Sequence, residues 1–547
     1  MVMVTAMVPN GFPQIGEIFR YVDCARALMI SVALTSFHFV HQPDAQTLPP
    51  VAPAEVSPAS LAAPSVSPTF RVVPQIELRE RFTDNAGLAD SGSAARGTVT
   101  DATAGLRIDY RAARAIANLD YQVNRLFYGQ QAGLNSTQHR LQSAATLEAV
   151  EKWLFLDARA SISQQNRSAF GVTSIADVAT NSSNRIETSS FQFGPKIRGN
   201  ISDIAMYQMR VIGTETRTRD SAFPDTRKYE WIGFVKNAPA SGRFGWFLDS
   251  NALVVDNNSL GNRKDSRIRA AITYEIDAQL HLSLSAGSES SNLDGKTLRR
   301  TTTRGVGLEW SPSNRTQLAA VTQKRFFGND HLVAFAHRTP LTAWNFISTK
   351  EIAASTNELG GSNSASVNNL LLDLLASTVP DSNARSEAIQ RRFEQTGVSS
   401  SSGIQDGFLT VRPFLNLRQE ASMALLGSRN TLTLSVGRRE QRAIDGDNGT
   451  TGIVAPIEPI RQFRANVAWA YRVSPTSTLR LVVSHLHTVG LLSDTLSTTQ
   501  QLQSLFLVTQ MGPQLTASLG LQKMGFSSTV ANSYRENVIV SAVSVRF

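Results

Sequence analysis

The chain has little cysteine and little charge. Its 547 residues include a single cysteine, Cys24, which lies in an N-terminal segment that we expect to be removed on export. A mature chain without thiols has no disulfides, no cysteine metal sites and no cysteine nucleophiles. Charged residues make up 18% of the chain, below the roughly 25% of an average soluble protein. We therefore expect a polar surface that carries few charges.

Long apolar runs are also missing. After Phe70 the sequence has no run of about 18 apolar residues, the length that a membrane-spanning helix needs. The apolar run at residues 28–40 follows Arg20 and Arg26 and is typical of a signal peptide. We predict a signal peptide over residues 1–45, followed by a flexible periplasmic tail rich in Pro, Ala and Ser over residues 46–70.

The common catalytic motifs are absent. There is no GxSxG, HExxH, Walker or CxxC sequence, and Gly305-Val-Gly307 lacks the third glycine of a dinucleotide-binding loop. We therefore predict no enzyme activity, no catalytic residues, no cofactor and no metal site. Two alternatives stay open. His485 and His487 could share a metal ion, although they follow an apolar strand face and fit a membrane interface better, and a hydrolase site could combine Asp, His and Ser from different strands.

The charge balance is basic. The formal net charge is +9, so anionic partners are expected. Nucleic acid is not expected as a partner, because the arginines are spread along the alternating strands and do not gather in a run.

What the sequence does contain is alternation of apolar and polar residues. In residues 114–124, alanine, leucine, tyrosine and valine occupy every second position, and polar or charged residues occupy the others except for Ile116. Alternation with a period of two is typical of a β-strand with one apolar and one polar face. The same pattern recurs at residues 280–285, 431–436 and 515–522.

The connections between these strands alternate in length. Short turns are expected at residues 112–113, 199–200, 311–314, 474–477 and 512–514. Longer polar loops are expected at residues 83–101, 166–185, 217–226, 256–264, 441–460 and 489–499. Short periplasmic turns that alternate with long outer loops are typical of bacterial outer-membrane barrels. We therefore predict an all-β protein with a single transmembrane antiparallel β-barrel of about 22 strands over residues 71–547, located in the outer membrane.

Aromatic residues support this prediction. Five of the six tryptophans lie near expected short turns and would form an aromatic girdle at the periplasmic side of the membrane: Trp153, Trp246, Trp310, Trp344 and Trp469. The final strand places Val543, Val545 and the terminal Phe547 on one face. Such an ending is similar to the signal that the outer-membrane assembly machinery recognises.

One segment departs from the period of two. Residues 366–397 read as two amphipathic helices that are separated by Pro380 and end at Gly397. The order of turns places this insertion in an outer loop. It could cap the barrel mouth, fold into it, or have no function.

Four segments carry a resemblance to a known family: LRERFTDN at 78–85, LDARASISQQNRSAFG at 156–171, FGNDHLVAFAHRTPLTAW at 327–344 and LGSRNTLTLSVGRRE at 426–440. They resemble the outer-membrane proteins associated with PEP-CTERM/exosortase systems. The resemblance implies a β-barrel encoded with exopolysaccharide biosynthesis and export functions. It transfers no functional residues.

Two classes of function follow. The first is a passage for exopolysaccharide or another anionic solute, lined by basic residues that we place on the lumen face: Arg107, Arg114, Arg210, Arg480 and Arg546. The second is a non-conducting structural or assembly component of the envelope, in which case the abundance of Arg over Lys reflects genome composition. The expected partners are outer-membrane lipid, lipopolysaccharide, the assembly machinery and exopolysaccharide.

Overall fold

The alternating segments form strands throughout. The structure, a computed structural model, describes residues 69–90, 92–172, 184–219, 223–237, 242–257, 261–294, 297–353, 404, 407–410, 413–444, 458–493 and 495–547. The strands are β1 (Thr69–Thr83), β2 (Gly97–Ala112), β3 (Ala115–Tyr128), β4 (Ser136–Val150), β5 (Leu154–Asn166), β6 (Arg185–Ile201), β7 (Ala205–Thr218), β8 (Thr226–Asn237), β9 (Phe244–Asn257), β10 (Gly261–Asp277), β11 (Leu280–Ser291), β12 (Arg299–Ser313), β13 (Thr316–Arg325), β14 (Gly328–Arg338), β15 (Thr342–Ala353), β16 (Phe414–Leu426), β17 (Asn430–Ala443), β18 (Ile460–Arg472), β19 (Ser477–Gly490), β20 (Ser497–Gln510), β21 (Leu515–Ser528) and β22 (Tyr534–Arg546).

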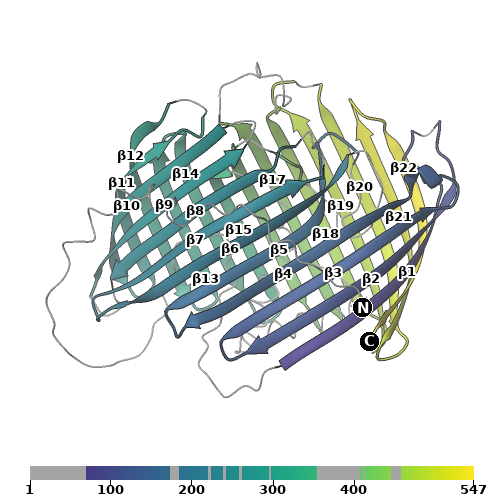
Figure 1. The fold of residues 1–547 in the computed structure, drawn as a ribbon, viewed down its shortest axis with the longest axis horizontal. Helices are drawn as coiled ribbons and strands as arrows, with labels where there is room; N and C mark the ends of the chain where they lie inside the picture. The colour runs from purple at the N-terminus through teal and green to yellow at the C-terminus, as the bar shows by residue number, and fades with distance from the viewer. Residues whose placement is uncertain are drawn as a thin grey trace, which may run out of the picture. The chain divides into compact units, whose positions relative to one another are not determined.

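These strands form one closed sheet. Each strand pairs antiparallel with its sequence neighbours, and β1 also pairs with β22, so that the 22-stranded sheet has no free edge. The first and last strands lie side by side at this seam (Figure 1). At its outer end, the Asn537 backbone N–H donates to Asp84 over 2.8 Å, and the Asn537 amide donates to the same carboxylate over 2.6 Å. The predicted all-β barrel of about 22 strands is confirmed.

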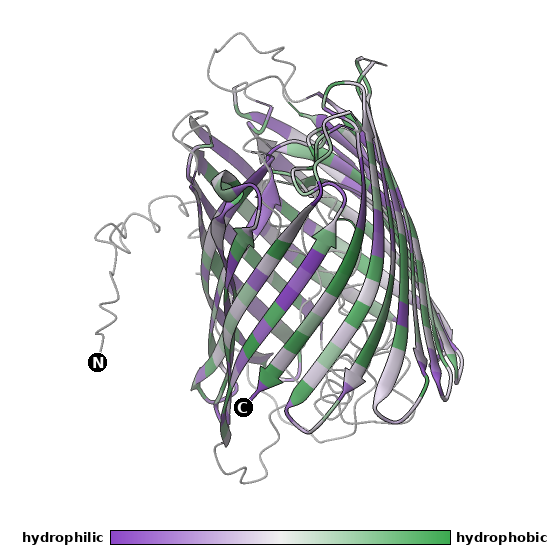
Figure 2. Ribbon diagram, turned by 90° about the vertical axis from the view of Figure 1, so that its right-hand side faces the viewer, coloured by the Kyte–Doolittle hydropathy of each residue, from purple (hydrophilic) through white to green (hydrophobic). Residues whose placement is uncertain are grey.

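The two faces of the sheet differ in polarity. Along each strand, apolar and polar residues alternate, which Figure 2 shows as alternating green and purple segments. Large apolar side chains are exposed on one face, and the most exposed in the strands include Phe244, Ile272, Leu284, Leu519 and Leu521. A soluble protein rarely exposes so much contiguous apolar surface. A closed barrel with an apolar outward face spans a membrane, and in bacteria such barrels lie in the outer membrane. The protein is an outer-membrane β-barrel.

The connections separate the two ends of the barrel. One end carries the short turns at residues 113–114, 151–153, 202–204, 238–243, 278–279, 314–315, 339–341, 427–429, 473–476 and 511–514. The other end carries the longer connections, among them residues 84–96, 167–184, 354–413 and 444–459. Three expected positions were wrong. Residues 199–200 lie within β6, whose turn follows at 202–204, and residues 311–313 lie within β12, whose turn follows at 314–315. The expected long loop at 256–264 is reduced to a connection at 258–260, because β9 and β10 continue into it.

Aromatic side chains gather at the short-turn end. The five tryptophans singled out above all lie in or within a few residues of a short turn. Trp153, Trp246, Trp310 and Trp344 are each more than 40% exposed, and Trp469 stacks on Tyr471 with ring centroids 5.8 Å apart. Further aromatic pairs are found at this end, Phe70 with Tyr110 and Phe244 with Tyr274. This placement is the one that an aromatic girdle at the membrane interface requires.

In the last strand, Val543, Val545 and Phe547 share the outward face, as the sequence predicted. Val543 and Val545 pair with Leu78 and Ile76 of β1, whose side chains are exposed on the outward face. Phe547 is 61% exposed, and its backbone N–H donates to the Pro74 carbonyl over 3.0 Å. The C-terminal residue therefore lies at the closing seam.

Some predictions fall outside the described part of the chain. The signal peptide and nearly all of the Pro-rich tail lie in residues 1–68, and the helical insertion lies in residues 354–403. β1 begins at Thr69, two residues before the expected start of the barrel. Among the described residues, no helix is long and apolar enough to cross a membrane.

We predict that assembly depends on Phe547. Phe547→Asp should strongly reduce the amount of folded barrel in the outer-membrane fraction, because it places a charge on the outward face beside the seam. The measurement is the fraction of heat-modifiable barrel on gels. The control is Phe170→Asp in the connection between β5 and β6. An equal reduction in both variants would show that the C-terminal position has no special role in assembly.

The orientation is tested by cysteine labelling in a Cys24→Ser background. Gly133 lies between β3 and β4, Gly512 lies between β20 and β21, and a Cβ atom at either position meets nothing within 4 Å. On intact cells, a membrane-impermeant maleimide should label Gly133→Cys but not Gly512→Cys. Both should be labelled after permeabilisation. The opposite pattern would mean that the short turns face the cell exterior.

Candidate functional site in the barrel lumen

The interior wall of the barrel is the candidate site. Residues that oppose each other in an antiparallel pair share a face, and the faces alternate along a strand. Val72 pairs with Ile108 on the outward face, so that Arg107, which pairs with Val73 and Asp120, lies on the lumen face. The same argument assigns every strand, and it places most strand arginines in the lumen.

Four of the five predicted lumen arginines lie on the lumen wall. Arg107 forms an ion pair with Asp109 over 3.0 Å. Arg210 pairs in register with Lys196, Arg480 with Ala470, and Arg546 with Gln75, all on the lumen face. Arg114 lies elsewhere. It belongs to the short turn between β2 and β3 and forms an ion pair with Glu151 of the next short turn over 3.0 Å, with both side chains more than half exposed.

The first cation-rich wall is formed by β5, β6 and β7. The Asp157 carboxylate lies 3.4 Å from Arg210 Nη2 and 3.9 Å from Lys196 Nζ. Lys196 and Arg198 also lie over the ring of Phe155, at 5.3 and 4.4 Å from its centroid. The aromatic face holds these two cations in place. Two of the three cations on this wall thus lie within 4 Å of the Asp157 carboxylate, and the third lies over the aromatic ring.

The second cation-rich wall is formed by β16, β17 and β18. Glu420 accepts hydrogen bonds from Arg418 (Nε at 3.2 Å, Nη2 at 2.8 Å) and from Arg464 (Nη2 at 3.2 Å). Arg439 directly opposes Arg418 in the register. The side chain of Glu420 is only 4% exposed, and Arg439 and Arg464 are buried as well. Two of the three cations on this wall thus bind the Glu420 carboxylate, and the third stands opposite Arg418.

The two cation-rich walls lie on opposite sides of the barrel, the first toward the short-turn end and the second toward the outer end. In a closed ring of 22 strands, opposite positions are separated by half the ring, and β5 and β16 are 16 − 5 = 11 strands apart. The strands β5 to β7 and β16 to β18 therefore lie on opposite sides of the lumen, one set in front of the other in Figure 1. Each of these two surfaces carries an excess of positive charge.

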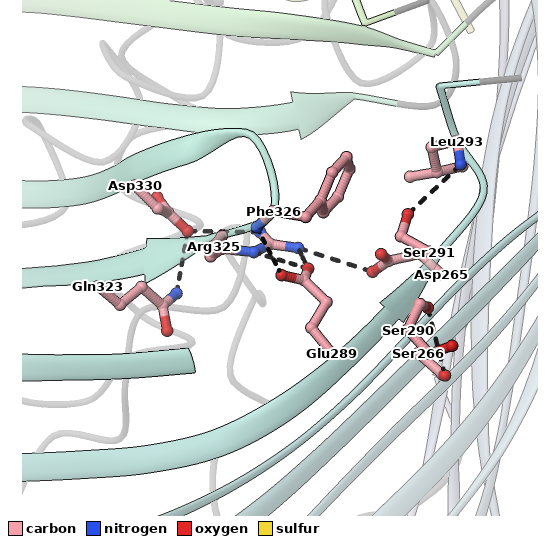
Figure 3. A network of polar contacts seen from close by, with 10 residues as sticks. All are labelled: Asp265, Ser266, Glu289, Ser290, Ser291, Leu293, Gln323, Arg325, Phe326 and Asp330. Carbon is pink, nitrogen blue, oxygen red and sulfur yellow. Dashed lines mark hydrogen bonds and ion pairs between the residues drawn. The ribbon is translucent and has the colours of Figure 1, made fainter. Parts of the chain in front are cut away.

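In a third cluster, carboxylates outnumber cations (Figure 3). Arg325 of β13 donates to Glu289 over 2.9 Å from Nε, and its other nitrogens lie 3.6 Å from Asp265 and 3.4 Å from Asp330. Gln323 donates to the same Asp330 carboxylate over 2.9 Å. One guanidinium is thus held by three carboxylates, and it links β10, β11, β13 and β14. This cluster, which we call the Arg325 network, stabilises the wall and adds no positive charge to it.

The outer mouth is crossed by the end of the long connection between β15 and β16. Asn166 at the end of β5 donates to the Gly407 carbonyl over 3.0 Å, and the Leu409 backbone N–H donates to the Asn166 carbonyl over 2.7 Å. Residues 166 and 408 form a parallel bridge. Phe408 packs with Ala169 and Ile460. A segment that immediately precedes β16 is thus attached to β5 on the opposite wall.

Ile404 extends this contact to a third part of the wall. It is buried with lumen-facing residues of β19 to β22, namely Leu486, Leu502, Met524, Phe526 and Tyr534. Residues 404 and 407–410, which we call the mouth segment, therefore contact strands from both sides of the barrel. The sequence predicted an insertion between β15 and β16 but did not indicate that its end is buried in the mouth.

The residues of the second cation-rich wall were missed from the sequence. A signal was present at Arg438-Arg439, where two consecutive arginines interrupt the alternation. Because consecutive strand residues point to opposite faces, one arginine of such a pair must face the lumen.

The glycines 305 and 307 lie on the lumen face of β12, where a Cβ atom at Gly305 would come within 2.7 Å of the Thr322 carbonyl oxygen. Close strand packing explains the choice of glycine there.

The two histidines of β19 lie on the outward face. His485 contacts the ring of Phe463, with centroids 6.5 Å apart, and His487 Nδ1 lies 3.0 Å from the hydroxyl of Thr499. Within the described residues, no group of three or more His, Cys, Asp or Glu side chains is arranged to hold a metal ion.

Comparisons with known proteins give only a likeness of fold. No protein-family model matches the chain, and no curated protein matches it. Similar solved structures include the siderophore receptor PirA from Pseudomonas aeruginosa, with 8% identity, a TM-score of 0.42, and coverage of 88% of this chain and 81% of that one. The FrpB iron transporter from Neisseria meningitidis has 10% identity, a TM-score of 0.45 and coverage of 87% and 82%. PirA from Acinetobacter baumannii has 8% identity, a TM-score of 0.45 and coverage of 88% and 81%.

We predict that the Arg325 network serves stability. Arg325→Gln leaves three carboxylates without their shared cation, and breaking a buried ion pair in this way costs about 3–5 kcal/mol. The measurement is urea-induced unfolding of the barrel in liposomes. The control is Arg217→Gln on an exposed ion pair with Glu215, where the loss should be about 0–1 kcal/mol. Similar losses for both variants would rule out a special role of the network.

Proposed function

We propose that the barrel is a passage for anionic solutes across the outer membrane. The observation that carries the proposal is the pair of cation-rich walls at β5–β7 and β16–β18, which lie on opposite sides of the lumen, the first toward the short-turn end and the second toward the outer end. The resemblance to PEP-CTERM/exosortase-associated proteins suggests an acidic exopolysaccharide as the solute.

The chemistry of the walls suits an anion that must bind and then leave. A guanidinium group can hold a carboxylate or phosphate through two parallel hydrogen bonds. Asp157 and Glu420 keep the neighbouring cations in position while leaving each wall with excess positive charge. Several moderate sites favour conduction over tight capture, because a solute can move from one site to the next.

The mouth segment provides a means of control. It is anchored to β5 by backbone hydrogen bonds and to β19–β22 by the apolar contacts of Ile404. Residues 366–397 lie in the same connection between β15 and β16. We propose that the mouth segment, through the buried side chains of Ile404 and Phe408, acts as an outer gate.

A second candidate is a non-conducting component of the envelope. The buried mouth segment favours it, because a segment that joins opposite walls narrows the opening. The numerous ion pairs on the lumen face favour it as well, since charges that neutralise each other stabilise a wall without attracting a solute.

Planar bilayer recordings distinguish the two. The purified barrel should conduct with a preference for anions, and the double variant Arg418→Gln/Arg464→Gln should reduce that preference, measured as the reversal potential in a salt gradient. Deleting residues 366–397, or changing Phe408 to Ala, should increase the conductance. The control is Lys324→Gln/Lys350→Gln, which removes two cations from the outward face and should leave the selectivity unchanged.

The outcome that contradicts the proposal is equally specific. A bilayer that stays closed with the full chain and with both mouth variants would favour the non-conducting component. Conductance without anion preference, unaffected by Arg418→Gln/Arg464→Gln, would show that the cation-rich walls do not select the solute.

A further inference from the structure

A second group of cations lies on the opposite side of the wall, facing the membrane. Seven lysine and arginine side chains are on the outward face of β12 to β18, toward the ends that carry the long connections. Six of them, all but Arg300 at the start of β12, are Arg304, Lys324, Lys350, Arg438, Arg442 and Arg461. We call this set the cationic arc. Five of these residues are an even number of residues away from an exposed apolar side chain of the same strand, so they share its outward face. The sixth, Lys324, directly opposes Arg304 and therefore points to the same face.

The register makes the arc continuous. Arg304 directly opposes Lys324. His331 opposes Lys350, Lys350 opposes Leu417, Leu417 opposes Glu440, and Glu440 opposes Arg461. Directly opposed residues in a sheet have Cβ atoms about 4.5–5.5 Å apart. Basic side chains therefore follow one another around the outer end of β12 to β18, with Leu417 of β16 and the carboxylate of Glu440 standing between Lys350 and Arg461.

That carboxylate organises the arginines of the arc. Glu440 accepts from Arg461 Nε over 2.7 Å, from Arg442 Nη2 over 3.3 Å, and from Arg438. Glu440 is only 7% exposed because these side chains cover it, whereas Arg438, Arg442 and Arg461 are 48%, 58% and 42% exposed. The three guanidinium groups are thus fixed around one anion and still present donors outward, with a net charge of two positive units.

The excess of cations is not found all around this end of the barrel. At comparable outward positions on β6 to β9, acidic residues are interspersed with the basic ones: Glu187, Glu215 and Asp256. There, Glu215 forms ion pairs with Arg217 over 2.9 Å and Arg227 over 3.8 Å. One side of the outward surface is therefore balanced in charge, and the other carries an excess of cations.

Apolar surface lies directly beside the arc on the membrane side. Two residues along the strands from the cations stand Val306, Val436 and Phe463, exposed by 52%, 47% and 43%. Phe346 of β15, four residues from Lys350, is 38% exposed. A ligand that fits this surface has an anionic headgroup attached to hydrocarbon chains, and its headgroup lies at the outer boundary of the apolar band.

We propose that the cationic arc binds lipopolysaccharide, the lipid of the outer leaflet. The phosphates of its lipid A portion would contact the guanidinium and ammonium groups, and its acyl chains would cover Val306, Val436 and Phe463. Arginine and lysine both bind phosphate, arginine through paired hydrogen bonds and lysine as a point charge. The site is independent of any solute in the lumen, because the two sets of cations lie on opposite faces of the same strands.

The experiment measures binding of defined lipids to the purified full-length barrel by native mass spectrometry. The probes are lipid A with two phosphates, the same lipid A with one phosphate removed, and phosphatidylglycerol. The unmodified protein should prefer the doubly phosphorylated lipid A. Lys324→Gln/Lys350→Gln should weaken this binding about thirtyfold, since each basic residue near an anionic surface raises the affinity about fivefold.

A second variant and a matched control complete the design. Arg438→Gln/Arg442→Gln/Arg461→Gln should weaken lipid A binding at least as strongly. Arg217→Gln/Arg227→Gln, from the balanced side, should leave it unchanged. Because the lysine variant does not disturb Glu440, it tests binding even if the arginine variant folds poorly. Equal losses in the control, or equal affinity for phosphatidylglycerol and lipid A in the unmodified protein, would overturn the proposal.

Discussion

Every other feature of this molecule depends on the hydrogen bonds that close the sheet between β1 and β22. Hydrocarbon offers no partner for a backbone N–H or C=O group, so a β-sheet crosses a membrane only without free edges. The pairing from Gln75 with Arg546 to Thr83 with Val538 removes the last two edges. Once the ring is closed, each strand has one face toward lipid and one toward the lumen. The face on which each strand residue lies then decides whether its side chain contacts lipid or the lumen.

This division explains how one arginine-rich sequence provides two different surfaces. Consecutive strand residues point to opposite faces, so that Arg438 joins the cationic arc on the membrane side while its neighbour Arg439 joins the second cation-rich wall of the lumen. The proposed solute passage and the proposed lipid site therefore share strands but not side chains. A substitution on one face can be used as the control for the other.

Ion pairs in the lumen serve two purposes that can be told apart by their charge balance. In the Arg325 network, three carboxylates surround one guanidinium, which joins four strands. At Asp157 and Glu420, the ratio is reversed, with several cations on one carboxylate. The first arrangement stabilises the wall, and the second leaves positive charge that can attract a solute. The mouth segment spans the ring above these walls and holds its opposite sides together.

The sequence by itself determined the all-β class, a strand number close to 22 and the face on which Arg107, Arg210, Arg480 and Arg546 lie. These properties are local, since an alternation of period two and the length of a turn are set by adjacent residues. Only the tertiary structure decided which charges meet. Arg464 reaches Glu420 across 44 residues of sequence, and Asn166 binds Gly407 across 241. Contacts of this kind depend on the register of many strands and on the closure of the ring, so that no local pattern contains them. Arg114 illustrates the limit: its position in the alternation suggested the lumen, but the β2–β3 turn begins one residue before it and directs it to Glu151.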